Sequence, residues 1–137
     1  MMGHRRHPDK VCAFMLAACL LWAGRPVQAH HSVTAMYDLS RVITLNGTVE
    51  SLMLGSPHSH LAIKVPEPLG RYDTWQVELP SLSFLERAGW TDHTLSRGQH
   101  LTLIGSPARY TASQMYVRSI TLANGTKLAL LPGTAAP

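Results

Sequence analysis

The chain has few cysteines, and both lie near its start. Cys12 and Cys19 are the two cysteines among 137 residues. If the chain is cleaved after Ala29, the mature protein has no thiol, which excludes disulfides and thiolate metal sites. A metal would then be bound by histidine, carboxylate, methionine or backbone atoms.

Long hydrophobic runs are also missing. The longest, Val11–Ala23, has 13 residues, whereas a membrane-spanning helix needs about 20. Arg5, Arg6 and Lys10 precede this run, and the small-residue pattern Val27-Gln28-Ala29 follows it. We therefore predict a cleavable signal peptide over residues 1–29, a periplasmic or secreted mature protein, and no transmembrane helix.

A second processing pattern competes with this one. Leu16-Ala17-Ala18-Cys19 fits a lipoprotein cleavage box, which would leave a lipidated Cys19 at the new N-terminus. The apolar stretch before Cys19 would be short, and Leu20–Ala23 continue it beyond the cut. Cleavage after Ala29 is therefore the preferred interpretation, and a lipid anchor at Cys19 is the alternative.

The mature chain has little excess charge of either sign. The whole sequence has a net charge of +4, with 12 basic and 8 acidic residues. Four of the basic residues and one of the acidic residues lie before position 30, which leaves eight and seven and a net charge of +1. This balance gives no electrostatic reason to expect nucleic acid or an anionic membrane as a partner.

Common catalytic signatures are missing as well. The sequence has neither a recognisable Ser-His-Asp order nor a glycine-rich phosphate loop. The sequence therefore shows no recognisable residues for hydrolase or nucleotide chemistry, and we predict a protein that is not an enzyme.

What the sequence does contain is a succession of β-type segments. Alternating apolar residues predict strands, and residues 81–88 have the spacing of a short helix. Asn46-Gly47 interrupts the first strand and suggests a bulge or sharp bend there. The predicted strands cover residues 42–54, 58–65, 72–79, 100–104 and 115–122, and Asn124-Gly125 makes a tight turn into residues 127–131.

The order of three strands, a helix and two more strands is typical of an OB-fold barrel. Its ligands usually lie beside the loop that joins the first two strands. We predict a β-β-β-α-β-β barrel domain over residues 30–131 and a flexible tail over 132–137. An open antiparallel meander packed on one helix is the alternative.

Four of the mature chain's histidines form two close pairs. His30 and His31 follow the predicted cleavage site, and His58 and His60 lie at the first turn between strands. A free His30 offers an α-amine and an imidazole that suit Cu²⁺, and His31 adds a second imidazole. If His58 and His60 both lie in a strand, they face the same way. The pattern favours copper, then zinc or nickel.

Three functions follow from these residues. The leading hypothesis is a binding protein that holds copper or another divalent ion through His30 and His31, with His58 and His60 completing the site. The second is a metal-free interaction module in which the turn between the first two strands and the region of Arg109 and Tyr110 bind a protein or small ligand, with the histidines as polar contacts. The third is a copper redox enzyme with an N-terminal histidine brace.

The chain resembles a family of small exported bacterial proteins known as domain of unknown function 6152. This resemblance implies an exported β-barrel and shared His30, His31 and His58, but no reaction. Ser56 and Ser59-His60 depart from the family pattern, so His60 is not carried over. The motifs are Ala29-His30-His31-Ser32, Leu45-Asn46-Gly47-Thr48-Val49, Pro57-His58, Trp75-Gln76-Val77-Glu78, Leu85-Glu86-Arg87-Ala88-Gly89-Trp90-Thr91, Leu95-Ser96-Arg97-Gly98, Gly105-Ser106-Pro107-Ala108-Arg109 and Asn124-Gly125-Thr126-Lys127-Leu128.

Overall fold

The structure is a computed structural model that describes residues 33–131. The predicted signal peptide (1–29), His30, His31 and the predicted tail (132–137) lie outside this part of the chain. No helix within it is long and apolar enough to cross a membrane. Its elements are α2 (Val33–Met36), β1 (Ile43–Met53), β2 (Ser59–Glu67), η1 (Pro68–Gly70), β3 (Arg71–Leu79), α3 (Leu82–Arg87), β4 (His100–Pro107), β5 (Gln114–Leu122) and β6 (Lys127–Leu128).

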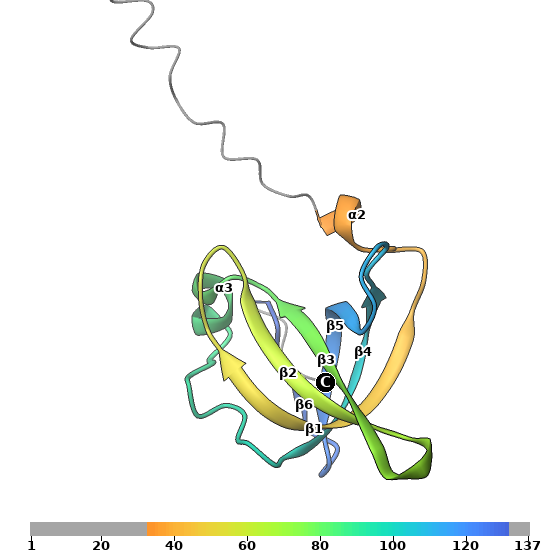
Figure 1. Ribbon diagram of the computed structural model, residues 1–137. Coiled ribbons are helices and arrows are strands. Elements are labelled where there is room, and N and C mark those ends of the chain that lie inside the picture. Colours follow the sequence, from red (N-terminus) through yellow and green to blue (C-terminus); the bar gives the residue numbers. More distant parts are fainter. Residues whose placement is uncertain (1–32, 132–137) are drawn as a thin grey trace, which may run out of the picture. The chain divides into compact units, whose positions relative to one another are not determined.

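The strands form one sheet that closes into a barrel (Figure 1). Their order is β3-β2-β1-β4-β5-β6, and consecutive neighbours in this order are antiparallel. Closure comes from a short parallel pairing in which residues 76–78 of β3 lie beside residues 114–116 of β5. The small OB-like barrel is therefore confirmed, with α3 between β3 and β4. The closing pair excludes an open meander.

Alternation along the strands fills the barrel with apolar side chains. Leu61 and Ile63 of β2 face Val77 of β3 from inside, whereas His60 and Lys64 are exposed. Burying aliphatic side chains in this way supplies about 1.5–3 kcal/mol each. The buried core consists of Val49, Leu61, Ile63, Val77, Leu79, Leu85, Trp90, Leu95, Leu101, Leu103, Met115, Val117 and Ile120.

The first strand bends elsewhere than the sequence suggests. β1 runs unbroken through Gly47, and its register against β2 shifts between Val49 and Ser51. The predicted bulge or bend at Asn46-Gly47 is therefore wrong in position. The glycine at position 47 is explained by close packing instead, since a Cβ there would lie 2.9 Å from the carbonyl oxygen of Lys64. Glycine allows β1 and β2 to approach each other closely at this point.

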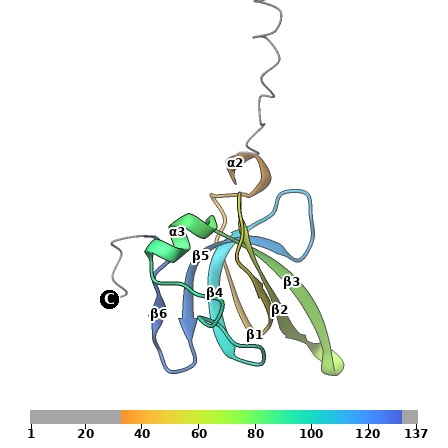
Figure 2. The same ribbon diagram turned by 90° about the vertical axis from the view of Figure 1, so that its left-hand side faces the viewer.

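The two ends of the barrel differ. Figure 2 shows α2, α3 and the turn between β1 and β2 at one end, and the β2–β3 hairpin and the β5–β6 turn at the other. The helix α2 is not among the predicted elements. It occupies a single turn, in which the Tyr37 amide donates to the Val33 carbonyl at 2.8 Å.

Candidate functional site

A buried carboxylate lies on the outside of the barrel wall, where β3 meets β5. Because Val77 and Leu79 point into the core, alternation turns Glu78 outward, opposite Tyr116 of β5. Glu78 is nevertheless only 7% exposed. A carboxylate in such a place needs hydrogen-bond donors, because burying it unpaired is costly.

Two side chains supply those donors, one to each oxygen. The Tyr37 hydroxyl donates to Oε2 at 2.6 Å, and Nδ1 of His58 lies 3.1 Å from Oε1. Gln114 Nε2 in turn donates to the Tyr37 hydroxyl oxygen at 2.9 Å. The cluster of Tyr37, His58, Glu78 and Gln114, called the Glu78 cluster below, thus joins four separate parts of the chain.

His58 is held in place by the turn that precedes β2. The hydroxyl of the buried Ser59 accepts from the Gly55 amide at 3.1 Å and donates to the Gly55 carbonyl at 3.3 Å. A carboxylate only accepts hydrogen bonds, so a neutral His58 carries its proton on Nδ1 and keeps a lone pair on Nε2. Its side chain is 35% exposed. The ring therefore offers one oriented nitrogen to a ligand.

Tyr37 remains a donor over a wide pH range. Burial, and then its hydrogen bond to Glu78, raise the pKa of the Tyr37 hydroxyl well above its usual value. Its ring lies 5.7 Å from that of Tyr116, whose pKa is also raised by burial and then by the charge of Glu78. Both phenols therefore stay protonated beside the carboxylate.

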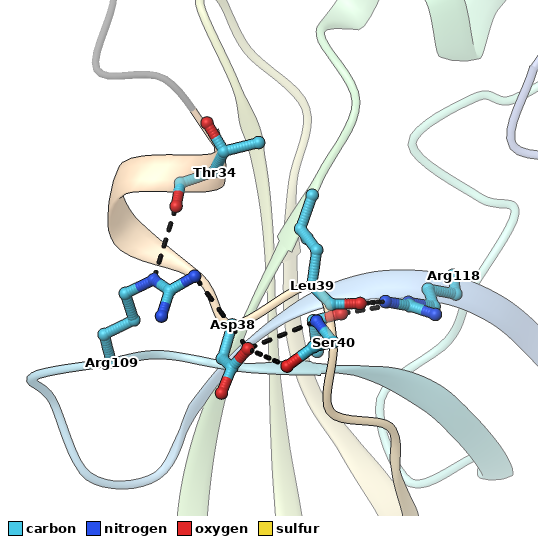
Figure 3. A network of polar contacts seen from close by, with 7 residues as sticks. Thr34, Asp38, Leu39, Ser40, Arg109 and Arg118 are labelled. Atoms are coloured by element: carbon cyan, nitrogen blue, oxygen red, sulfur yellow. Dashed lines mark hydrogen bonds and ion pairs between the residues drawn. The ribbon is translucent and has the colours of Figure 1, made fainter.

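Tyr37 belongs to an N-terminal strap, residues 33–42, which two arginines tie to the barrel (Figure 3). Arg109 Nε donates to the Thr34 carbonyl at 3.3 Å, and the Arg109 guanidinium lies 3.8 Å from Asp38. Arg118 donates to the Leu39 carbonyl. Asp38 also accepts from the Ser40 hydroxyl at 2.6 Å, and this bond is the largest cause of its lowered pKa.

A pocket of about 320 Å³ opens beside His58. Most of its lining residues are apolar or aromatic, and His58 contributes an imidazole. Volumes near 300 Å³ are at the small end of the range for ligand sites. The lining residues are Pro57, His58, Pro80, Ser81, Phe84, Tyr116 and Leu131.

The structure describes two of the four predicted metal ligands, His58 and His60. His30 and His31 lie outside residues 33–131. Since β2 begins at Ser59, His58 lies in the turn, and the condition that both histidines share a strand is not met. His60 is exposed, in register with Glu78. Within the described residues, no three or more histidine, cysteine, aspartate or glutamate side chains are grouped for a metal ion.

Arg109 and Tyr110, which were predicted to contact a ligand, have different surroundings. Arg109 anchors the strap, whereas Tyr110 is 89% exposed. Ligand binding by these two residues stays a prediction.

Sequence reasoning missed the roles of Tyr37, Glu78 and Gln114. The available signal was an acidic residue between two core-facing positions, Val77 and Leu79, which predicts an outward Glu78. Its partners were not predictable, because Tyr37 lies 41 residues away in sequence.

Comparison with known proteins gives a family and a fold relative. The model of a family of unknown function, DUF6152, matches residues 18–115. The mitochondrial single-stranded DNA-binding protein Rim1 of S. cerevisiae is similar in structure, with a TM-score of 0.48 and 12% sequence identity. That similarity covers 69% of this chain and 98% of Rim1. No curated protein matches the chain.

Proposed function

The chain belongs to the DUF6152 family of unknown function, and we propose that it is an exported binding protein for copper or another divalent metal ion. In this proposal His58 provides one ligand, and His30 and His31 provide the others. The supporting observation is the contact of 3.1 Å between His58 Nδ1 and the buried carboxylate of Glu78.

A carboxylate behind a histidine is a common arrangement at metal sites. It holds the ring in one orientation and makes the opposite nitrogen a better ligand. Glu78 occupies this position toward His58, and its other oxygen is held by Tyr37. The imidazole is thus oriented before a metal arrives, and it remains partly exposed.

Tyr37, which donates to the same carboxylate, lies six residues after His31 in the sequence. Tyr37 belongs to the strap and donates a hydrogen bond to Glu78, so the strap is tied to the Glu78 cluster. His31 is two residues before Val33, and two extended residues reach about 7 Å. The proposal therefore requires that His30 and His31 approach His58.

Nitrogen ligands decide which metal is preferred. An α-amine and imidazoles without thiolate favour copper, followed by zinc or nickel, over calcium or magnesium. His60 is assigned a supporting role at most, because its side chain is exposed on β2.

Copper titration tests this proposal on protein exported with its own leader. Intact mass first establishes whether His30 is the N-terminal residue. His58→Gln keeps a donor for Glu78 but lacks the imidazole, so we expect copper affinity to fall at least about tenfold, within the range seen when support around a metal is lost. His93→Ala, which removes an exposed histidine from another turn, is the matched control.

Three results would contradict the proposal. One is a cleaved protein that does not bind copper. Another is equal affinity in His58→Gln and His93→Ala. The third is equal affinity in a variant that keeps one extra residue before His30, because this residue removes the free amine from the chelate.

The apolar pocket beside His58 supports a second candidate, a metal-free module for a small ligand. Phe84 and Tyr116 would contact an apolar body, and His58 Nε2 would accept one hydrogen bond. A small phenol such as p-cresol is a suitable probe. This function predicts binding that persists in the presence of a metal chelator and weakens in Phe84→Ala, whereas the metal proposal predicts unchanged copper affinity in that variant.

A further inference from the structure

A second hollow lies at the end of the barrel away from His58. It measures about 340 Å³ and crosses the sheet from the β2–β3 hairpin to the end of β5. OB-fold ligands usually lie near the loop between the first two strands, which is at the other end here. The lining residues are Asn46, Gly47, Thr48, Pro66, Tyr72, His100, Leu101, Thr102 and Ala123.

Strand register explains why polar side chains gather in this hollow. Asn46 pairs with Thr102 across β1 and β4, and Thr48 pairs with His100 two positions along. Residues two apart on a strand point the same way, so these four side chains share one face of the sheet. Leu101, between two of them, points into the core.

Two hydrogen bonds orient the four side chains and leave other groups available. The Thr102 hydroxyl donates to Asn46 Oδ1 at 2.8 Å, which leaves the two N–H donors of the Asn46 amide. The Thr48 hydroxyl lies 3.1 Å from His100 Nδ1, which leaves His100 Nε2. The hollow is therefore lined by a donor-rich amide and an imidazole nitrogen on the same face of the sheet.

An aromatic ring borders the same hollow. Tyr72, at the start of β3, is 66% exposed, although burying a tyrosine ring is favourable. Pro66 precedes the hairpin, and Ala123 lies at the far end of the hollow. Among the residues that line the hollow, none is aspartate, glutamate, lysine or arginine. Apart from the imidazole of His100, no side chain in this lining can carry a charge near neutral pH.

We propose that this hollow binds a neutral sugar residue. A pyranose has an apolar C–H face that suits the Tyr72 ring, and hydroxyls that both donate and accept hydrogen bonds, as Asn46 and His100 require. The absence of lysine and arginine from the lining disfavours phosphates, nucleotides and acidic sugars. This site is independent of the proposed metal function, since it shares no residue with the Glu78 cluster.

NMR titration of the isotope-labelled protein tests the proposal. The probes are D-glucose, D-galactose, D-mannose, N-acetylglucosamine and cellobiose, with D-glucuronate as the charged comparison. We expect saturable shifts for at least one neutral sugar, centred on the Gly47 and Leu101 amides, and weaker or no effects with D-glucuronate. No saturable shift with any neutral sugar would overturn the proposal.

Matched variants separate this site from general surface effects. Asn46→Ala removes the amide donors and should weaken binding about two- to tenfold, the equivalent of one or two hydrogen bonds. Tyr72→Ala should weaken it similarly, whereas Tyr72→Phe keeps the ring and should retain most of the affinity. Tyr110→Ala removes an exposed tyrosine elsewhere and is the control.

The remaining outcomes are equally decisive. Unchanged affinity in both Asn46→Ala and Tyr72→Ala, in variants whose spectra show the native fold, would contradict the site. Tighter binding of an oligothymidylate than of every neutral sugar at these amides would also overturn the ligand class. His58→Gln should leave sugar binding unchanged.

Discussion

The two oxygens of Glu78 join parts of the chain that lie far apart in sequence. Tyr37 reaches Oε2 from the strap, and His58 reaches Oε1 from the turn before β2. A buried acceptor that loses one of its donors bears the cost of desolvation without compensation. A substitution in this cluster should therefore lower the free energy of unfolding more than the same substitution at an exposed position.

Tyr37→Phe tests this expectation with the loss of one oxygen atom. It removes a donor from Glu78 and leaves Gln114 Nε2 without its acceptor. We expect the free energy of unfolding in urea to fall by about 1–3 kcal/mol. Tyr110→Phe, at an exposed position, should change it by less than about 0.5 kcal/mol. Equal effects of the two substitutions would refute the role of the cluster.

The raised pKa values of Tyr37 and Tyr116 predict a loss of stability in alkali. Both phenols ionise in the unfolded chain near the usual tyrosine pKa of about 10. In the folded protein they ionise at higher pH, because their pKa values are raised. Above that pH the folded state holds more protons than the unfolded state, so its stability falls as pH rises. Their contribution is complete below about pH 10.

Urea unfolding between pH 9 and pH 11.5 measures this dependence. Tyr37→Phe should flatten the fall above about pH 10, because one of the two phenols is gone. A fall of the same slope in the variant would show that other groups cause it.

At the scale of elements, close contact between β4 and β5 depends on a glycine. The register of the two strands shifts between Ile104 and Gly105, and a Cβ on Gly105 would clash with the Tyr116 carbonyl oxygen. Gly105→Ala should therefore destabilise the protein by about 2 kcal/mol or more. Gly55→Ala would meet only an ordinary contact at 3.5 Å. Denaturation curves that coincide for the two variants would disprove this explanation.

The strap depends on side chains rather than on sheet pairing over most of its length. Its regular pairing with the barrel is a bridge between Tyr37 and Ala108. Arg109→Ala removes the bond to the Thr34 carbonyl and the contact with Asp38. Amide hydrogen exchange within the strap should then accelerate about tenfold or more, while exchange in β2 stays unchanged. Arg97→Ala, which alters an exposed arginine, should leave both rates unchanged.

Most elements are predictable from the sequence because their cause is local. Alternation in residues 58–65 and 72–79 reflects an inside and an outside of the barrel, and the structure has β2 and β3 there. The position of the β1 bulge was not predictable, because Gly47 responds to the Lys64 carbonyl on another strand. The single turn of α2 has no apolar periodicity long enough to detect.

The candidate site was predictable only in part. His58 is marked by its neighbour Pro57 and by the second histidine of the pair, but its partner Glu78 lies on a different strand. Outward alternation places Glu78 on the surface, and only tertiary structure covers it with Tyr37. Such a cluster depends on which loops the closed barrel brings together, and a pattern along one segment does not contain that information.

At the scale of the whole molecule, closure requires pairings between distant segments. Thr48 pairs with His100, and Val77 pairs with Met115. Barrels dominated by such contacts fold in about milliseconds to seconds, because loop closure precedes the gain from pairing. Stopped-flow tryptophan fluorescence, reporting on the buried Trp90, should show refolding in that range. Complete refolding within about 100 µs would contradict it.

The strap also has a consequence for the order of events during synthesis. Its contacts include those with Glu78, Arg109, Gln114 and Arg118, all of which are made after it. The first part of the described chain to leave the ribosome is therefore among the last to be fixed. A nascent chain that stops before β5 has no Gln114 or Arg118 to hold the strap.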